Sequence, residues 1–325
     1  MAGPRWLFAL PVFALLLFSA VDISAMDVTQ APIGYYNGSS GGRYAIGAIM
    51  EGTQPYRHNP VLTTVPDSWQ SWHVKDAAAV LVDGTYYLYY AGSSDGLHYS
   101  IGLATSKSGL RFDRIAEPIL THGPTGTWDS VAVAFPTVYV DVDGWHMLFY
   151  GRNEAGVYAI GLATSPDGIA WTKYAGNPVF EGDEAWNVGG VIPADIVRDG
   201  DHWLLYYGGI GADGSWQGGV RAFTEWRRPF TKIAHEPILT APYGPWKSVI
   251  PGAVRVVDGR WEMLATVFHC CLPEMREETR RAASEDGLTW TMPLTDVPAL
   301  PIQRWASESA ENVTWLQPRY SPYPQ

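Results

Sequence analysis

The sequence predicts an all-β protein, a five-bladed β-propeller in which each blade is a four-stranded antiparallel sheet. Three observations carry this prediction: a repeat of about 59 residues, an Asp-Gly hairpin signal within each unit, and the lack of any long helical pattern. A repeat of this length is typical of propellers, because one small sheet cannot bury its faces alone and must stack against its neighbours.

The repeat is clearest in a strand that contains a glycine. YSIGLATSKSGLRF at 99–112 returns as YAIGLATSPDGIAW at 158–171, and more faintly at 219–230 and 280–290. The aromatic residues that close these segments are spaced 59, 59 and 60 residues apart, and each is followed by a proline in a short apolar motif. A tryptophan opens each following unit: Trp69, Trp128, Trp186, Trp246 and Trp305.

Turn residues divide each unit into strands. An Asp-Gly pair between two apolar runs, as at 83–84 and 143–144, is a strong hairpin signal because a tight primed turn needs positive φ. The later Ser-x-Asp-Gly turns at Asp167 and Asp286 resemble the Asp-box turns of secreted sugar-processing propellers. We expect these two aspartates to stabilise their own turns, by accepting bonds from turn amides, and not to bind a ligand.

The ends of the chain are predicted to close the ring. Four complete units lie between about Trp69 and Leu300, and the segment at about 43–62 supplies outer strands of a fifth blade whose inner strands come from 304–316. Joining the two ends in one blade removes the open sheet edges of a linear array. We therefore expect residues 26–325 to form one domain, with the closing blade shared by N- and C-terminal strands.

Composition narrows the set of partners. Charged residues make up 17% of the 325 residues and the net charge is −11, so a basic surface for a polyanion is absent and nucleic acid is not an expected partner. Aromatic residues make up 13%, with 15 Trp and 18 Tyr. This content suits a β-rich core and equally suits stacking on sugar rings.

Residues 1–25 predict a signal peptide. They contain one Arg, an apolar run from Trp6 to Phe18 and small residues towards Ala25, the order typical of a secretory signal. An uncleaved anchor is the alternative, less favoured because the run is short for a bilayer. We expect a secreted protein, extracellular or periplasmic, that does not associate with a membrane after signal removal.

The sequence contains two cysteines, and they are neighbours: Cys270 and Cys271. In an oxidising compartment they either form a strained ring that joins adjacent residues or remain a pair of buried reduced thiols. The sequence leaves both alternatives open.

A carboxylate at the head of an apolar strand marks the candidate site. Asp76 begins the strand in KDAAAVLVDGTYYLYYAG at 75–92, and the inner strands of a propeller converge on one funnel. The segment resembles the Lys-Asp-Pro-Ser opening strand of glycoside hydrolase family 43 and its clan, the five-bladed arabinanases, xylosidases and arabinofuranosidases. The resemblance implies that Asp76 is the general base, with Ala77 where these relatives usually have proline.

The resemblance also implies two further carboxylates, one on the second blade and a glutamic acid on the third. The sequence departs from this pattern, since alignment of the repeats places Pro136 and Pro251 opposite Asp76 in the second and fourth blades, and the third blade reads VIPAD. Only Asp76 carries over by motif.

The acid that would act with Asp76 is therefore sought among nearby carboxylates. Glu184 is the first choice because it precedes the third inner strand. Glu311 in the closing blade competes with it, and Asp129 is a further candidate. Each of these three could equally be a solvated surface residue.

Aromatic and cationic residues near the funnel are candidates for substrate binding. A histidine facing the axis could hold a water or a central calcium ion, as in some relatives, although a lone histidine is more often a hydrogen-bonded structural residue. No other cofactor is expected, and most tryptophans of a propeller pack between blades. The candidates are Trp72, His73, Arg152, Trp186 and His269.

The function predicted from these features is a secreted glycoside hydrolase that acts on oligo- or polysaccharides of the arabinose or xylose type through a pair of carboxylates. A non-catalytic carbohydrate-binding propeller is the alternative favoured by the missing acids. A glycoside phosphorylase is less favoured, because a phosphate site needs several cations. Two sequons, at Asn37 and Asn312, would matter only in a glycosylating host.

Overall fold

The structure, a computed structural model, describes residues 31, 33–224, 230–241, 246–269, 277–293 and 298–318. Within these ranges the chain is built from strands, and the only helical element is the short 3-10 turn η3 (Glu51–Thr53). None of the described segments forms a helix long and apolar enough to span a membrane. The predicted signal peptide at 1–25 lies outside the described residues.

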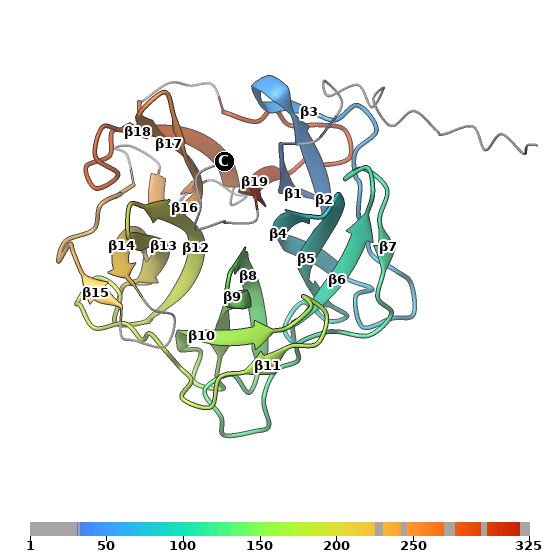
Figure 1. Cartoon of the computed structure of the whole chain (residues 1–325), viewed down its shortest axis with the longest axis horizontal. Coiled ribbons are helices and arrows are strands. Elements are labelled where there is room, and N and C mark those ends of the chain that lie inside the picture. The colour runs from blue at the N-terminus through green and yellow to red at the C-terminus, as the bar shows by residue number, and fades with distance from the viewer. Residues whose placement is uncertain are drawn as a thin grey trace, which may run out of the picture. The chain divides into compact units, whose positions relative to one another are not determined.

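The antiparallel pairings fall into five groups, which we call blades 1 to 5 and which are arranged around a common centre in Figure 1. Blade 1 contains β4 (His73–Val82), β5 (Thr85–Ser93), β6 (Ser100–Ser106) and β7 (Asp113–Arg114), and blade 2 contains β8 (Ala132–Asp141), β9 (Gly144–Arg152), β10 (Tyr158–Ser165) and β11 (Thr172–Lys173). Blade 3 contains β12 (Gly190–Asp199), β13 (His202–Ile210), β14 (Trp216–Phe223) and β15 (Thr231–Lys232), and blade 4 contains β16 (Trp246–Val257), β17 (Arg260–His269) and β18 (Glu277–Ser284). Blade 5 contains β19 (Ser309–Pro318), β1 (Gly34–Ser40), β2 (Arg43–Met50) and β3 (Gln54–Pro55).

Hydrogen bonds also cross from blade to blade. Short parallel contacts such as Tyr158↔Gly190 and Glu278↔Ala310 join neighbouring groups, so the ladders merge into an 11-stranded and an 8-stranded sheet. The prediction of an all-β propeller is confirmed. The count of five blades rests on the antiparallel groups, since the merged sheets do not separate them.

The two ends of the described residues meet in blade 5. The C-terminal strand β19 is innermost and pairs with β1, with Gly34 opposite Trp315 and Ser39 opposite Ser309. The amide of Leu316 also donates to the carbonyl of Ile33 at 2.9 Å. The closing blade is therefore shared as predicted, with β19 as the single C-terminal strand.

The repeated tryptophans pack on glycines of their own blades. Trp128 lies against Gly151 and Gly161, where an added Cβ would come within 2.2 and 2.5 Å of the ring. Only glycine allows so close an approach, which explains why both middle strands of a unit keep one. The same arrangement recurs at Trp69 on Gly92 and Gly102, Trp186 on Gly209 and Gly219, and Trp305 on Gly38 and Gly47.

The Ser-x-Asp-Gly turns hold neighbouring blades together. In blade 2, Asp167 Oδ1 accepts bonds from the amides of Ile169 and Ala170, both at 2.9 Å, as expected for a structural turn. The hydroxyl of Tyr89 in blade 1 donates to the carbonyl of Gly168 in this turn at 2.7 Å. Equivalent interblade bonds run from Tyr35 to Gly109 and from Tyr206 to Gly287.

Candidate active site

Each inner strand contains a β-bulge close to its start. In β4, Lys75 pairs with Ala91 and Ala78 with Tyr89, so Asp76 and Ala77 together face one residue. A bulge bends the strand and changes the direction of a side chain, which is why bulges are common beside active sites. Asp76 is buried and has φ of 53° at this bulge, a left-handed conformation that aspartate tolerates.

The register defines which residues match Asp76 in other blades. By the same count, Phe135 in β8 and Pro251 in β16 match it. The sequence alignment that placed Pro136 there is wrong by one residue, since Phe135 lies seven residues after Trp128 just as Asp76 lies seven residues after Trp69. Phe135 has φ of 49°, which costs a bulky residue about 1–3 kcal/mol and which the surrounding structure must enforce.

Two asparagines of blade 5 hold the Asp76 carboxylate. Its Oδ1 accepts from Asn37 Nδ2 at 3.0 Å and from Asn312 Nδ2 at 3.2 Å, and the Asp76 amide donates to Asn37 Oδ1 at 2.8 Å. Its Oδ2 is buried and accepts no hydrogen bond from the described residues, but lies 3.6 Å from Lys75 Nζ. Such donors stabilise the ionised form of a carboxyl group.

The Lys75 ammonium lies among aromatic rings beside this carboxylate. It is 5.3, 5.1 and 5.9 Å from the ring centres of Tyr44, Tyr99 and Phe135, which belong to three different blades. Burial lowers the pKa of Lys75, but the charge of Asp76 together with the nearby tyrosines outweighs burial and raises this pKa above its ordinary value. Lys75 therefore remains a cation.

A second carboxyl group belongs to the same electrostatic environment. Glu277 is the first residue of β18, and burial raises its pKa to about 7. The charge of Lys75 lowers this pKa and the charge of Asp76 raises it, so the two acidic side chains are electrostatically coupled. Near neutral pH, Glu277 can therefore carry a proton, as a general acid must.

Aromatic rings form an arc through four blades at this end of the inner strands. Successive ring centres along the arc are 5.1–5.9 Å apart, from Tyr44 to His73 and Tyr99 and, separately, from Phe135 to Tyr150, Tyr158 and Trp216. Lys75 joins the two parts of the arc through its contacts with Tyr99 and Phe135. Such surfaces suit the apolar faces of sugar rings.

Three of the predicted binding residues lie beside this arc. His73 accepts at Nδ1 from the Tyr99 hydroxyl and donates from Nε2 to the Gly42 carbonyl at 3.0 Å, and burial lowers its pKa. Trp72 is 38% exposed, with the Arg43 guanidinium 4.8 Å above its ring. Arg152 ends β9 and donates to the Leu97 carbonyl at 3.2 Å.

The structure gives His73 a structural role in place of the proposed metal role. Both of its ring nitrogens are engaged, so neither is open to a calcium ion. Across the ranges that the structure describes, no three His, Cys, Asp or Glu side chains cluster in a way that could hold a metal.

Two predicted acids lie at the outer edges of their blades. Asp129 pairs with Lys173 of β11 and accepts from Thr127, while Glu184 pairs with Lys232 of β15. Because β11 and β15 are the outermost strands, neither carboxylate is brought to Asp76. In the structure these two residues attach the loop before an inner strand to the outer edge of the same blade.

Trp186 is also a packing residue. Its ring stacks on Tyr207 at 5.7 Å and its Nε1 donates to the His235 carbonyl at 3.1 Å. Its ring also contacts two glycines of blade 3, so the contacts of Trp186 in the structure are packing contacts within its own blade.

Glu311 lies in the closing blade but one position away from the expected match. It is opposite Asn37 in the register, so it corresponds to Lys75, and the neighbouring Asn312 corresponds to Asp76. Glu311 is buried, and its Oε2 has no hydrogen-bond partner among the described residues. The side chain of His269 and both cysteines, 270 and 271, lie outside what the structure describes.

The two sequons have a role that sequence patterns did not reveal. Asn37 is fully buried and Asn312 partly buried, and both amides bind Asp76. An asparagine held in this way is not accessible for glycan attachment. Glu277 was also missed, because no motif surrounds it and its raised pKa results from burial in the folded protein.

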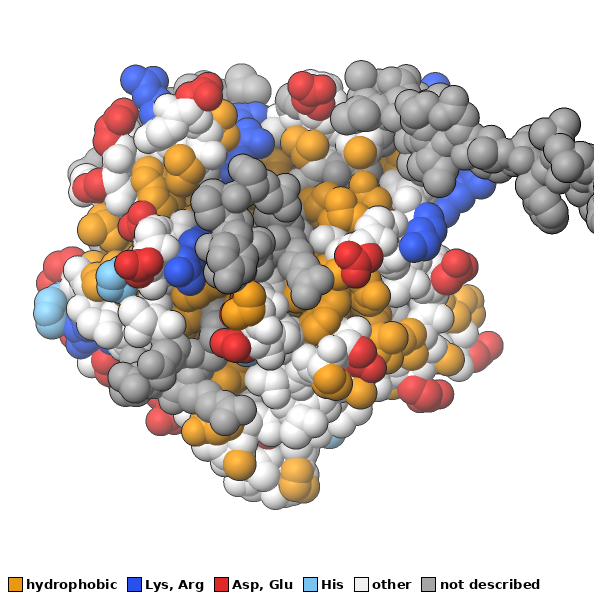
Figure 2. Space-filling model, viewed as in Figure 1, with side chains coloured by type: hydrophobic (Ala, Val, Ile, Leu, Met, Phe, Trp, Pro, Cys, Tyr) orange, Lys and Arg blue, Asp and Glu red, His pale blue; other side chains and the backbone are white. Residues whose placement is uncertain are grey.

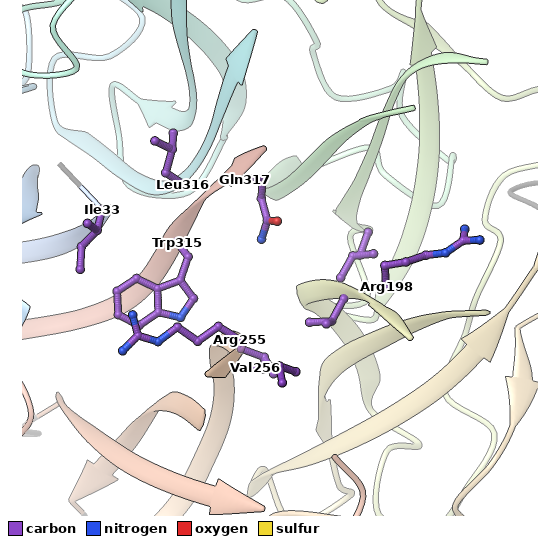
Figure 3. A pocket seen from close by; sticks show the side chains of 10 residues that line it. Ile33, Arg198, Arg255, Val256, Trp315, Leu316 and Gln317 are labelled. Atoms are coloured by element: carbon purple, nitrogen blue, oxygen red, sulfur yellow. The ribbon is translucent and has the colours of Figure 1, made fainter. Parts of the chain in front are cut away.

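Two cavities lie along the inner strands. A small one of about 30 Å³, lined by bulge residues that include Asp76, Phe135 and Asn312, has room for about one water. A larger one of about 340 Å³ lies towards the other end of the inner strands, where Figure 3 shows Trp315 beside Arg255 with Gln317 nearby. No carboxyl group lines the larger cavity, so it does not offer an acid and a base.

In the view of Figure 2, Lys and Arg side chains lie among acidic and apolar groups. The chemistry of the candidate site depends on the carboxyl groups of Asp76 and Glu277 and on the aromatic arc.

Comparisons with known proteins show similarity in fold. No family model and no curated protein matches this sequence. Among solved structures, BT0996 in its RGII complex aligns over 81% of this protein and 86% of its own length, with a TM-score of 0.63 and 18% identity. The Cellvibrio cellulosa α-L-arabinanase complexed with arabinohexaose aligns over 82% and 93%, with a TM-score of 0.59 and 13% identity.

A third neighbour has a different reaction. The Listeria innocua β-1,2-mannobiose phosphorylase, in complex with β-1,2-mannobiose, aligns over 69% of this protein and 64% of its own length, with a TM-score of 0.55 and 16% identity. The fold of this protein is thus that of carbohydrate-active propellers, the fold that the strand resemblance implied. At these identities the similarity establishes the fold and does not by itself assign a reaction.

Proposed function

We propose that this protein is a secreted glycoside hydrolase that acts on arabinose-, xylose- or related sugar-containing glycans. The observation that carries the proposal is a buried Asp76 carboxylate, held by two asparagine amides and Lys75, together with Glu277, whose pKa burial raises to about 7 and whose electrostatic environment includes Asp76 and Lys75. A pair of carboxyl groups with different protonation states is what hydrolysis of a glycosidic bond requires.

Each residue of the site has a role in this reaction. Asp76 removes a proton from water or attacks the anomeric carbon through Oδ2, while protonated Glu277 donates its proton to the leaving oxygen. Lys75 compensates the charge of Asp76, and the aromatic arc stacks on the sugar. Glu277 thereby takes the role first expected of Glu184, Glu311 or Asp129.

The substrate class is supported by what the structural neighbours bind. One of them is an RGII complex and another is an arabinanase complexed with arabinohexaose. We therefore place arabinose-containing glycans first in the test. Secretion is part of the proposal because the first 25 residues have the order of a signal peptide.

The test is an activity screen on aryl glycosides and polysaccharides with wild type, Asp76→Asn and Glu277→Gln. We expect either substitution to lower kcat/KM about 10²–10⁴-fold, the usual contribution of a general acid or base. Glu285→Gln is the matched control, since this glutamate lies on the surface. Equal turnover by wild type and Asp76→Asn would exclude Asp76 from the mechanism.

A carbohydrate-binding propeller is the second candidate, and a specific observation favours it. Phe135 occupies the position that matches Asp76 in blade 2, so the second-blade acid implied by the resemblance is replaced there by an apolar residue. Calorimetric titration with the same glycans separates the candidates, because binding without turnover supports this alternative. Sugar phosphate released only when inorganic phosphate is added would indicate a phosphorylase.

A further inference from the structure

We propose that Asn37, Asn312 and Thr266 form a positioning relay that fixes the Asp76 carboxylate and leaves one of its oxygens free for the reaction. This inference rests on the proposed function and extends it to residues that do not touch substrate. The three residues come from β1, β19 and β17, so they belong to blades 4 and 5 while Asp76 belongs to blade 1.

Asn37 holds Asp76 at two points. Its Oδ1 accepts the Asp76 amide proton at 2.8 Å and its Nδ2 donates to Asp76 Oδ1 at 3.0 Å. The side chain is fully buried, so water cannot replace either bond. Because one amide binds both backbone and carboxylate, it fixes the strained backbone of Asp76 and the orientation of its side chain together.

Asn312 approaches the same oxygen from the matching bulge of β19. Its backbone has φ of 46°, a left-handed conformation for which asparagine is suited. The Thr266 hydroxyl accepts the Asn312 amide proton at 2.9 Å and donates to Asn312 Oδ1 at 3.1 Å. Since the threonine occupies the oxygen end of this amide, its nitrogen end is directed to Asp76 at 3.2 Å.

The two asparagines leave the carboxylate with unequal oxygens. Oδ1 accepts two amide protons, whereas Oδ2 accepts no hydrogen bond in the described part of the protein and has the Lys75 ammonium 3.6 Å away as its counter-charge. Asp76 also lines the small cavity with room for about one water. Oδ2, which must accept a proton or form a bond in the proposed reaction, thus carries no hydrogen bond, while Oδ1 orients the carboxylate.

The kinetic test uses Asn37→Ala, Asn312→Ala and Thr266→Val. We expect kcat to fall about 10- to 100-fold with KM changed less than about twofold, the effect typical of groups that orient a catalytic residue. The acid limb of the kcat profile should move to higher pH in both asparagine variants, because the ionised carboxylate loses a donor. Thr266→Val is the smallest change of the three, and it tests the relay even if an alanine variant does not fold.

Two control variants remove similar buried bonds that do not reach Asp76. Ser39→Ala breaks the Ser39–Ser309 contact between β1 and β19, and Thr279→Val breaks the bond from Thr279 to the Ala310 carbonyl. Both should lose stability without moving the pH profile. A control that shifts the acid limb as much as Asn312→Ala does would overturn the relay.

Asn312→Asp is a further sharp variant because it preserves shape. It places a second carboxyl group against Asp76, and two adjacent carboxyl groups share one proton. We expect the acid limb to move to higher pH by more than in Asn312→Ala. An unchanged profile would contradict contact between the two side chains.

A readout without substrate separates this inference from the proposed function. In protein labelled with ¹³C at aspartate carboxyl groups, the Asp76 resonance is assigned by its loss in Asp76→Asn. It should titrate at higher pH in Asn37→Ala and Asn312→Ala than in wild type. Unchanged titration in both would overturn the relay, whereas shifted titration in a protein that hydrolyses no glycan would refute only the glycosidase proposal.

Discussion

At the scale of single residues, the site depends on how burial and charge divide protons between Asp76 and Glu277. Lys75 offsets the charge of Asp76 and also lowers the pKa of Glu277, which burial and Asp76 raise to about 7. The balance favours a protonated Glu277 in slightly acidic solution. The pH profile of kcat/KM is therefore expected to fall on its alkaline side close to neutral pH, because Glu277 loses its proton there.

Glu277→Gln tests that assignment. An acid with a pKa of about 7 loses its proton as the pH rises, so wild-type kcat/KM should fall above about pH 7 and the variant should lack this limb. The loss in rate should be greatest for substrates with alkyl leaving groups, which need protonation, and smallest for nitrophenyl glycosides. A variant that retains the wild-type alkaline limb would assign the acid to another group, with buried Glu311 the first to test.

At the scale of strands, blades 1, 2, 3 and 5 each pack a tryptophan ring against two glycines. The glycines belong to the second and third strands of the blade, so the ring clamps the centre of the sheet. This explains why the sequence repeat is strongest in the glycine-containing strand. It also accounts for the contacts of Trp186, and the sequence gives no sign of which tryptophan face is covered.

Gly161→Ala measures the strength of this contact. The added methyl group would lie 2.5 Å from the Trp128 ring and 2.8 Å from Phe149, so the core is overpacked. We expect a loss of about 1–3 kcal/mol in the free energy of unfolding, measured by urea denaturation. Trp128→Phe in the same protein should recover part of the loss by making room for the methyl group. If the double variant loses as much unfolding free energy as the two single variants added together, direct contact is contradicted.

At the scale of the whole molecule, Asp195 joins blades 3, 4 and 5. Its Oδ2 accepts from the Val254 amide at 2.7 Å, and its Oδ1 accepts from Gln317 Nε2 at 3.2 Å. Burial raises its pKa to about 7, although these bonds and that from the Ile196 amide lower it. The folded protein therefore binds a proton here that the unfolded protein, with an ordinary aspartate, releases near pH 4.

This predicts that stability falls as pH rises. A pKa raised on folding contributes stability that is complete below the unfolded pKa and is lost as pH rises through the folded value, so the loss lies between about pH 4 and pH 7. Three pKa units correspond to about 4 kcal/mol. In urea denaturation the stability of Asp195→Asn should fall less steeply than that of wild type in this window, and the fall that remains belongs to Glu277, whose pKa burial also raises to about 7. Asp201→Asn, on the surface, should follow wild type, and a curve for Asp195→Asn as steep as that of wild type would contradict the prediction.

Much of the architecture could be predicted from the sequence, because blades repeat locally. The Asp-Gly turns and periodic tryptophans identify strands whose partners are close in the sequence, and Asp76 was found because it heads such a strand. Site contacts between blades are not local. Glu277 lies without a motif at the start of a third strand, and Glu184 pairs with a lysine 48 residues away.

The bond from Asn312 to Asp76 joins residues 236 positions apart in the sequence. During synthesis the ribosome adds Asp76 long before Asn312, at about 5–20 residues per second. A nascent polypeptide that already contains blades 1 to 3 therefore still lacks the amide that orients its base. Enzymatic activity would begin only once translation of the gene is nearly complete, so an unfinished product released early would be inert towards glycans inside the cell.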